Sequence, residues 1–245
     1  MSNDYYNSKV QEIAPQYLSL SFDQVHENWG HYLPAILDKP NASILDVGAG
    51  VGRDVSHIAN LLAEKYQSDN QCRVYAVEPA IQMLKKGQAT TKGQNVHWLQ
   101  DSLPALDKTT RLEISFDLIL LSAVWMHVPT SQRSRSLRKL ANLLKPGGKI
   151  VISLKFGMSA EEQHERKMLE AVAQNLGLFS MLEAQNSEDQ LGRDGVYWQT
   201  LVLQMPDDGT GAFPFIRHVA INDGKSATHK LALLRVLLRI ADGHA

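Results

Sequence analysis

The sequence predicts an α/β protein in which helices cover both faces of a mostly parallel sheet. Short runs rich in β-branched and aliphatic residues occur at 43–47, 73–77, 96–99, 116–121 and 149–154. Segments with apolar residues at helical spacing separate these runs. The runs are apolar throughout rather than alternating, which is typical of parallel strands that are buried on both faces.

The helices between the strands are indicated by their spacing and by the residues that end them. After the first strand, Val55, Ile58 and Leu62 recur three and seven positions apart. A second helical segment carries leucines at positions 137, 140, 143 and 144, and we expect the Lys-Pro-Gly-Gly run at 145–148 to end it.

The last third of the core region is predicted to end the sheet with an antiparallel pair. A helix is expected at 160–176, followed by strands at 179–183 and 196–204. No clear helix separates those two strands, so they are free to pair with each other at one edge.

Three regions follow from this pattern. Residues 1–37 are predicted to form a helical cap segment, residues 38–205 the core, and residues 206–245 a C-terminal extension that begins with the breaker run at 206–211. The extension carries a predicted amphipathic helix at about 226–241. Between 213 and 245 there are five Lys or Arg residues against two Asp, so this helix either packs with a solvated basic face or docks a partner, and it is compatible with a linker to a further domain.

Composition excludes several classes of protein. The net charge is −1, so no global field favours nucleic acid or an anionic membrane. The single cysteine, Cys72, cannot form an internal disulfide, and no metal site is predicted. The polar N-terminus and the absence of a long apolar run predict a cytoplasmic protein that does not cross a membrane. The oligomeric state is not predicted.

A glycine-rich turn follows the first strand and is the strongest indication of a ligand site. Its glycines are Gly48, Gly50 and Gly52, between Asp46 and Arg53. A turn of this kind between strand and helix lets a ligand approach the backbone closely. The dinucleotide fingerprint requires a glycine or alanine where Arg53 stands, and no Gly-Lys-Ser/Thr follows for a Walker loop.

Charge narrows the choice of ligand. Asp46 and Asp54 flank the helix N-terminus and would oppose the pyrophosphate of NAD. S-adenosylmethionine (SAM) has no phosphate; it has a cationic ammonium, a cationic sulfonium and a carboxylate. Asp46 suits the ammonium, and Arg53 or backbone N–H groups could bind the carboxylate.

Two further strands end in acidic residues. Glu78, followed by Pro79, ends the second strand and is placed to accept the ribose hydroxyls of a nucleoside. Asp101, followed by Ser102, ends the third strand and could accept a hydrogen bond from an adenine amino group. The alternative for Asp101 is a helix cap, because Asp and Ser favour N-caps.

Taken together, these segments resemble motifs I to III of the class I SAM-dependent methyltransferases, and the strands at 116–121 and 149–154 resemble the next two family segments. The resemblance covers roughly residues 40–205. It implies a Rossmann-like three-layer sandwich with a seven-stranded sheet in the order 3-2-1-4-5-7-6, strand 7 being antiparallel. It also implies SAM as cofactor and S-adenosylhomocysteine (SAH) as product.

The fourth strand leads to the candidate catalytic residues. Ser122 and Trp125 are predicted to contact the cofactor, and Trp125 and His127 to line the acceptor pocket. His127 is a candidate general base, the alternatives being pocket lining or a structural role. Tyr6 and Tyr17 of the N-terminal segment could close over the ligand, and His26, Trp29 and His31 could line the acceptor side. For each of these five residues structural packing is the favoured alternative.

The acceptor is predicted only as a class. Amino-directed DNA methyltransferases have Asp/Asn-Pro-Pro-Tyr/Phe where this chain has Ser-Ala-Val-Trp at 122–125, and no Pro-Cys motif is present. The favoured acceptor is therefore an oxygen or nitrogen of a small molecule. The alternatives are a nucleic-acid or protein acceptor guided by the basic C-terminal helix, and a SAM-binding module without catalysis.

Overall fold

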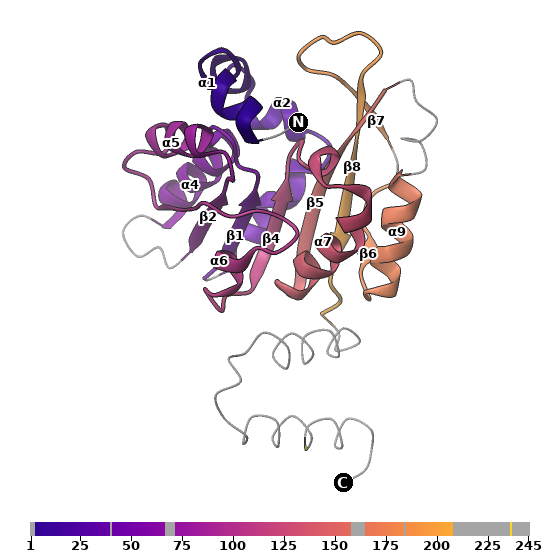
Figure 1. Ribbon diagram of the computed structural model, residues 1–245. Helices are drawn as coiled ribbons and strands as arrows, with labels where there is room; N and C mark the ends of the chain where they lie inside the picture. The colour runs from indigo at the N-terminus through magenta and orange to yellow at the C-terminus, as the bar shows by residue number, and fades with distance from the viewer. Residues whose placement is uncertain are drawn as a thin grey trace.

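A single eight-stranded sheet forms the centre of the molecule (Figure 1). The computed structural model describes residues 3–39, 41–66, 72–157, 165–183, 185–207 and 236. The strand order is β3-β2-β1-β4-β5-β8-β6, with β7 also paired to β8. The strands are β1 (Ser43–Val47), β2 (Arg73–Val77), β3 (Val96–Leu99), β4 (Phe116–Leu121), β5 (Leu144–Phe156), β6 (Phe179–Ser180), β7 (Asn186–Glu188) and β8 (Tyr197–Gln204).

Pairing is parallel from β3 to β5 and antiparallel beyond it. β1 is buried at every residue between β2 and β4, and β4 is buried at every residue between β1 and β5. The predicted fold class, order and antiparallel final pair are confirmed, with β8 in the place of the predicted strand 7. The first four strands have the predicted bounds because each is a short, mainly apolar run.

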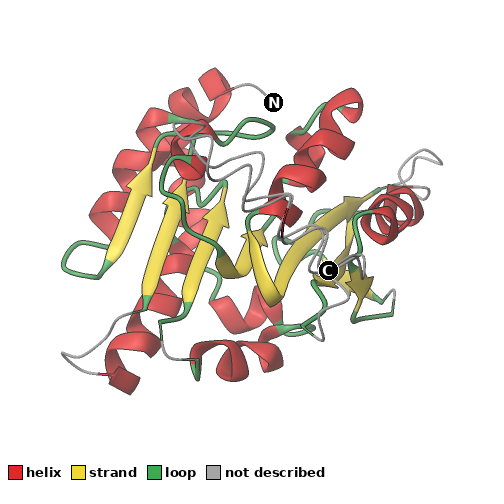
Figure 2. Cartoon of the chain, turned by 90° about the horizontal axis from the view of Figure 1, so that it is seen from below, coloured by secondary structure: helices red, strands yellow, loops and turns green. Residues whose placement is uncertain are grey.

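Helices cover both faces of the sheet (Figure 2). One face packs against α7 and α9 through Leu137, Leu140 and Leu169. The other packs against α2, α3 and α4 through residues such as Phe22 and Ile58. The helices are α1 (Asn3–Leu18), α2 (Phe22–His26), α3 (Leu33–Leu37), α4 (Arg53–Tyr66), α5 (Ile81–Thr90), α6 (Asp107–Thr110), α7 (Thr130–Asn142) and α9 (Glu165–Asn175), with short 3-10 turns η1 (Gly30–Tyr32) and η3 (Trp125–His127).

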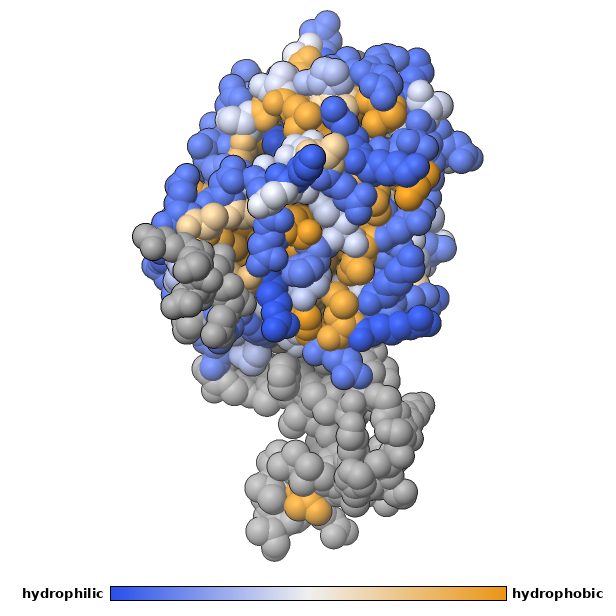
Figure 3. Space-filling view, turned by 90° about the vertical axis from the view of Figure 1, so that its left-hand side faces the viewer, coloured by the Kyte–Doolittle hydropathy of each residue, from blue (hydrophilic) through white to orange (hydrophobic). Residues whose placement is uncertain are grey.

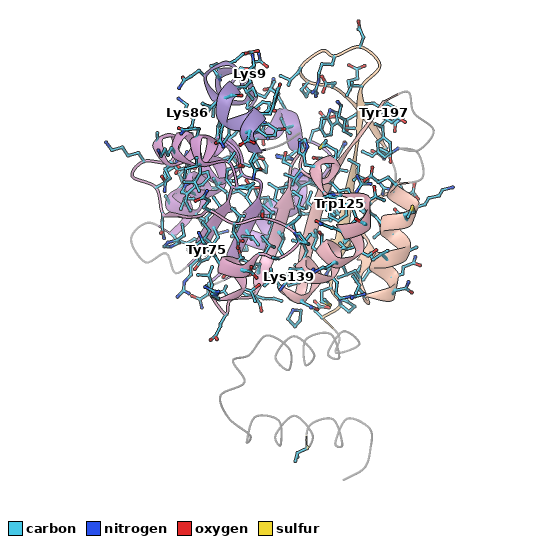
Figure 4. The ribbon with its side chains drawn as sticks, viewed as in Figure 1. Lys9, Tyr75, Lys86, Trp125, Lys139 and Tyr197 are labelled. Atoms are coloured by element: carbon cyan, nitrogen blue, oxygen red, sulfur yellow. The ribbon has the colours of Figure 1, made fainter. Side chains whose placement is uncertain are left out.

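The N-terminal helix α1 lies beside α5 rather than on the sheet (Figure 1). Its apolar residues Val10, Ile13 and Ala14 pack against Ala80 and Met83 at the start of α5. Lys9 of α1 and Lys86 of α5 lie at the surface (Figure 4). This position puts the inner side of α1 above the carboxyl ends of β1 and β2.

The amino ends of the strands are held by a buried carboxylate. Asp117 of β4 is 3% exposed and accepts hydrogen bonds from the N–H of Ser43 and from the ammonium groups of Lys39 and Lys145. A buried carboxylate needs such partners to offset its desolvation. This cluster ties β1, β4 and β5 together at the end opposite the glycine-rich turn.

The outer part of the sheet at β3 is less buried than its centre. The residues of β3 are partly exposed, whereas those of β1 are fully buried. Figure 3, which views this side of the molecule, shows a mainly hydrophilic surface with hydrophobic residues visible between the polar ones.

The beginning of β5 differs from the prediction. Leu144, expected at the end of a helix, is already a strand residue paired with Phe116, and the Lys-Pro-Gly-Gly run lies inside β5. The register shifts between Phe116 and Leu118 because the extra residues form an irregularity in the strand. A Cβ on Gly148 would lie 2.8 Å from the carbonyl oxygens of Lys145 and Phe116, so only glycine fits there.

The edge beyond β8 also differs. The predicted strand at 179–183 is only Phe179–Ser180, and an unpredicted strand, Asn186–Glu188, pairs with the other end of β8. The sequence Asn-Ser-Glu has low β-propensity, so its strand depends on pairing with β8. β6 covers one end of the β8 edge and β7 covers the other. The predicted amphipathic helix at about 226–241 lies outside the described residues apart from Val236.

Candidate functional site

A cavity of about 450 Å³ lies at the carboxyl ends of the strands. In an open α/β sheet this edge is where ligands bind. The wall formed by the ends of β1, β2 and β3 is called the glycine-loop side: residues 46–51, 53–54, 77–79 and 101–103. The wall formed by α1, the loop after β4, β5, β8 and the β7–β8 hairpin is called the hairpin side: residues 6, 17, 126–129, 153, 155, 187–191, 193, 198 and 200.

The N–H groups of the glycine-rich turn are used inside the protein. Those of Gly48 and Ala49 donate to the carbonyl of Val77, and that of Gly52 donates to the carbonyl of Ala49. The Gly50 N–H donates to the carboxylate of Glu78. A loop that cradles phosphate needs N–H groups directed at the ligand. These amides instead hold the turn against β2.

Two of the three glycines are required by close packing. Gly48 has φ +76°, and a Cβ there would lie 2.4 Å from a methyl group of Val124. Gly52 has φ +83° and faces Gly87 and Trp98, so it lets α4 approach α5. Gly48 and Gly50 line the cavity as predicted, whereas Gly52 does not. The prediction that Gly52 contacts the ligand is therefore corrected to a packing role.

Asp46 presents an unpaired carboxylate to the cavity. It is 2% exposed, and its Oδ1 has no hydrogen-bond partner. Burial, and next the neighbouring carboxylate of Asp54, raises the pKa of Asp46 well above its usual range. A buried polar atom without a partner is costly unless a ligand satisfies it. The structure therefore places an acceptor for a cation or a hydrogen-bond donor at the end of β1.

Asp54, by contrast, is fully engaged. It accepts two hydrogen bonds from Arg53, from Nε at 2.6 Å and Nη2 at 3.0 Å, and lies 3.0 Å from Nε2 of His26. Burial alone would raise the pKa of Asp54, but His26 and Arg53 lower it. Arg53 also reaches the hydroxyl of Ser122 at 3.5 Å. Its Nη1 has no partner among the described residues and is available to a carboxylate.

His26 and Trp29 are structural residues. They are 3% and 1% exposed, and the Trp29 indole donates a hydrogen bond to Nδ1 of His26. Of the two alternatives drawn from the sequence, packing is observed for His26 and Trp29, and none of the three residues, His31 included, borders the cavity. The rings of His26 and Trp29 pack against Phe22, and Nε2 of His26 lies 3.0 Å from the Asp54 carboxylate.

Glu78 braces the turn and faces the cavity. Its two oxygens accept the N–H groups of Gly50, at 2.9 Å, and Ala80, at 2.8 Å. Burial raises the pKa of Glu78, and the two backbone hydrogen bonds oppose this. Each carboxylate oxygen has a second lone pair. Glu78 can thus brace the turn and still accept hydroxyl groups of a ligand, with Pro79 beside it in the wall.

Asp101 caps the loop that follows β3. Its Oδ1 accepts the N–H of Ser102, and its Oδ2 accepts the N–H and hydroxyl of Thr109. Asp101 is not a helix N-cap, since the N-cap of α6 is Leu106, but its hydrogen bonds to Thr109 fasten the loop to that helix. Asp101 and Ser102 also line the cavity, so a contact with a ligand stays a prediction.

Trp125 does not border the cavity. It is 0% exposed and lies in the core between the sheet and α7 (Figure 4). The prediction that its ring contacts cofactor and acceptor is corrected, because η3 turns the indole inward. The neighbours Ser122, Ala123, Val124, Met126 and His127 line the cavity instead.

His127 joins the loop after β4 to the N-terminal helix. Its Nε2 lies 2.9 Å from the hydroxyl of Tyr6, and the two rings are in edge contact. Burial, and less strongly the positive charge of Lys155, lowers the pKa of His127. Burial, and next the neighbouring Tyr17, raises the pKa of Tyr6. The three predicted pocket residues therefore lie close together in the cavity: Tyr6, Tyr17 and His127. The lowered pKa of His127 favours the neutral imidazole.

The sequence did not predict the part of the hairpin side that β5, β8 and the β7–β8 hairpin form. Ser153 and Lys155 of β5 pair with Thr200 and Trp198 of β8, and all four side chains line the cavity. Asp189 and Arg193 of the β7–β8 hairpin complete the wall. The sequence signal for these residues is the alternation of side chains along β5. Leu154 and Phe156 face the core, so Ser153 and Lys155 face the other side. The partner strand could not be read from the local sequence.

Two kinds of feature are absent from the described ranges. No helix there is long and apolar enough to span a membrane. No group of three or more His, Cys, Asp or Glu side chains in those ranges is arranged to hold a metal ion.

Comparison with protein families gives two matches. Residues 45–150 match the methyltransferase domain family. Residues 209–245 match a domain of unknown function, DUF8808. The first match covers the glycine-rich turn, Glu78, Asp101 and His127, and the second begins close to the predicted boundary at 206.

Curated relatives share about a quarter of the aligned residues. A carboxy-S-adenosyl-L-methionine synthase of Pseudomonas fluorescens is 25% identical over 166 residues, which are 65% of this chain and 64% of that protein. An uncharacterized methyltransferase of Geobacillus kaustophilus is 26% identical over 148 residues, 60% of each chain. The chain therefore spans less than two thirds of the length of these relatives.

Solved structures share the fold. Magnesium protoporphyrin IX methyltransferase from Synechocystis, with bound SAM, has a TM-score of 0.56 at 16% identity, covering 83% of this chain and 94% of that one. The Burkholderia thailandensis 1,6-didemethyltoxoflavin-N1-methyltransferase has a TM-score of 0.56 at 18% identity, covering 84% and 87%.

Proposed function

The chain carries a methyltransferase domain at residues 45–150 and has the class I SAM-dependent methyltransferase fold, and from this premise we propose that it transfers a methyl group from SAM to an oxygen or nitrogen of a small molecule. The observation that carries the proposal is the buried, unpaired carboxylate of Asp46 at the cavity wall.

The glycine-loop side fits SAM. Asp46 would accept the ammonium group, and the free Nη1 of Arg53 would donate to the carboxylate. Glu78 would accept the ribose hydroxyls through its remaining lone pairs. Pro79, Met83 and Leu103 offer an apolar wall to adenine, near Asp101 and Ser102. When bound, SAM supplies a methyl group that is activated by the positive sulfonium.

The same wall disfavours ligands with phosphate groups. Four amides of the turn, those of residues 48–50 and 52, donate to acceptors inside the protein. Asp46 and Glu78 would oppose an added negative charge. Like charges close together in a site of low dielectric repel strongly. A positively charged ligand relieves this repulsion, which supports SAM over NAD.

His127 is proposed to accept the proton that an acceptor hydroxyl or amine loses during methyl transfer. Its lowered pKa keeps the imidazole neutral at neutral pH, and its contact with the Tyr6 hydroxyl orients the ring. Positioning supplies most of the rate in such a displacement, and a general base adds about 100- to 10,000-fold. His127→Ala should therefore lower turnover by roughly this factor and leave SAH affinity within about twofold, since His127 lies outside the glycine-loop side. Unchanged turnover would remove His127 from the mechanism.

Small-molecule acceptors are supported by the size of the cavity and by neighbours of the same fold. A cavity of about 450 Å³ is of ligand size, since such pockets are about 300–1,000 Å³. Two neighbours are named for methylation of a porphyrin and of a toxoflavin precursor. A macromolecular acceptor would depend on the predicted basic helix at about 226–241, which lies outside the described ranges apart from Val236.

The test is formation of SAH. The purified protein is incubated with SAM and a deproteinised small-molecule extract, and SAH and newly methylated products are measured by mass spectrometry. We expect SAH together with a product heavier by one CH₂. SAM binding with no SAH formed would support a binding module instead, and methylation confined to added RNA, DNA or protein would support a macromolecular acceptor.

A further inference from the structure

Lys155 is an unpaired cation on the hairpin side of the cavity. Three cationic side chains of Lys or Arg line the cavity, and two of them are neutralised: Arg53 by Asp54 and Arg193 by Asp189. Lys155 forms no ion pair within the part of the chain that the structure describes. Its positive charge acts on the cavity, since it contributes to the lowered pKa of His127.

The β5–β8 register fixes the direction of the Lys155 side chain. Lys155 is paired with Trp198, and two positions away Ser153 is paired with Thr200. Directly paired residues of antiparallel strands lie on the same face. All four side chains border the cavity, whereas Leu154 and Phe156 face the core.

Nearby groups hold this wall in place. The Ser153 hydroxyl accepts the N–H of Ala123 and so fixes the loop that leads to His127. Asp189 accepts hydrogen bonds from Arg193 and from the indole of Trp198. Arg193 thus neutralises the charge of Asp189, and a hydrogen bond from Arg193 holds the pKa of Asp189 low. Lys155 is left beside an aromatic ring, in a wall that is already built.

We propose that Lys155 binds a carboxylate of the methyl acceptor, so that the substrate class is a small, singly negative carboxylic acid with an apolar or aromatic body. This inference rests on the proposed function, which assigns the glycine-loop side to SAM and leaves the hairpin side to the acceptor. The Trp198 ring, Met126 and Leu191 would contact the apolar body. Glu188 also borders this wall, and its charge disfavours a doubly charged phosphate.

The test compares acids with their own amides on the full chain saturated with SAH. Dissociation constants of benzoate and phenylacetate are measured by NMR titration against benzamide and phenylacetamide, with phenyl phosphate as a further arm. We expect each carboxylate to bind about tenfold or more tightly than its amide, since a charge-assisted hydrogen bond is formed only by the acid. Carboxylates that bind no better than their amides, or phenyl phosphate that binds better than both acids, would overturn the proposal.

Variants locate the effect. Lys155→Met should lower carboxylate affinity to the level of the amide, and Lys155→Arg should retain it within about threefold. Lys149→Met removes a lysine of the same strand that does not line the cavity and should change nothing. A carboxylate preference that survives in Lys155→Met contradicts the assignment. The comparison of acids with amides on the unaltered chain needs no variant, so a misfolded variant does not weaken the test.

The NMR resonances of the His127 ring add an independent readout. Because Lys155 lowers the pKa of His127, a bound carboxylate or the Lys155→Met change should raise that pKa, and an amide should not. An unchanged pKa of His127 on carboxylate binding would place the acid elsewhere. Should SAH fail to bind, the proposed function fails, but the titrations are repeated on the free protein and still decide the role of Lys155.

Discussion

The two walls of the cavity differ in how the chain builds them. The glycine-loop side consists of turns that directly follow β1, β2 and β3, and its partners lie close in sequence: Glu78 braces a turn 28 residues away. The hairpin side brings together distant residues, such as Tyr6 and His127, which are 121 positions apart. The first wall is therefore made by local motifs, and the second by the order of strands in the sheet.

The two walls suit different ligands. Turns after parallel strands present the same backbone geometry whatever the rest of the chain does, so they suit a ligand shared by many enzymes. A wall made from a terminal helix, a strand pair and a hairpin varies with each chain, so it suits a particular acceptor. Changes to the glycine-loop side should thus alter SAH affinity, and changes to the hairpin side should alter turnover and acceptor choice.

The largest expected effect on SAH affinity comes from Gly48→Ala. The added Cβ would lie 2.4 Å from Val124, and the turn must shift because neither the backbone nor the branched side chain can yield cheaply. We expect SAH to bind at least about 100-fold more weakly in calorimetry, since this loss would combine the strain with the displacement of several contacts.

Gly93→Ala is the matched control for that change. Gly93 also has a positive φ, of +86°, but a Cβ there meets nothing within 4 Å. Both variants carry the cost of the left-handed conformation, about 1–2 kcal/mol, and only Gly48→Ala distorts the cavity. Equal SAH affinity in the two variants would show that the turn does not shape the ligand site.

Asp46→Asn should have the next largest effect. Losing the charge-assisted hydrogen bond to the ammonium costs about 1.5–3 kcal/mol, or roughly 10- to 150-fold in SAH affinity. Because the pKa of Asp46 is raised in the free protein, SAH affinity of the unaltered chain should increase with pH as Asp46 loses its proton. In Asp46→Asn this part of the pH dependence should vanish.

The ionised carboxylate of Asp46 raises SAH affinity but lowers the stability of the free protein. The folded state raises the pKa of Asp46 above its unfolded value, so the free protein loses stability as pH rises through the folded pKa. Asp46→Asn removes that loss, and thermal unfolding at neutral pH should then occur at a higher temperature. A variant that binds SAH normally, or that unfolds at a lower temperature than the unaltered chain, would contradict an unpaired charge at this site.

Tyr6→Phe tests the hairpin side with a smaller change. The variant loses the hydroxyl that lies 2.9 Å from His127 Nε2. A hydrogen bond of this kind contributes about 0.5–1.5 kcal/mol, so turnover should fall roughly 2- to 10-fold while SAH affinity stays within about twofold. Tyr5→Phe alters the exposed neighbouring tyrosine and should leave both values unchanged. A loss of SAH affinity in Tyr6→Phe without a change in turnover would reverse the assignment of the two walls.

Asp117→Asn should affect neither wall. Asp117 lies at the opposite ends of the strands, where it accepts hydrogen bonds from Ser43, Lys39 and Lys145. Weakening this buried cluster should cost about 1–3 kcal/mol of stability, or roughly 2–12 °C in the unfolding midpoint, as calorimetry can measure. SAH affinity well below the melting range should remain the same; a loss there would mean that the amino ends of the strands shape the cavity.

The sequence predicts the features that local motifs build, and it does not predict those that depend on distant parts of the chain. The bounds of the first four strands, and the cavity positions of Asp46, Glu78 and Asp101, follow from local runs and turns. Trp125 was misplaced because a single strained turn, with Ala123 at φ +56° and the 3-10 turn after it, decides which of two adjacent side chains points inward. Lys155 was missed because its direction is set by pairing with β8, 43 residues further along the chain.

Calorimetry of SAH against NAD tests the central claim most directly, which is that the glycine-loop side accepts an adenosyl ligand whose ammonium group pairs with Asp46, and not a phosphate-bearing one. The account predicts that SAH binds, more tightly as pH rises from acidic to neutral, and that NAD produces no binding heat. Binding of NAD together with no binding of SAH would contradict it.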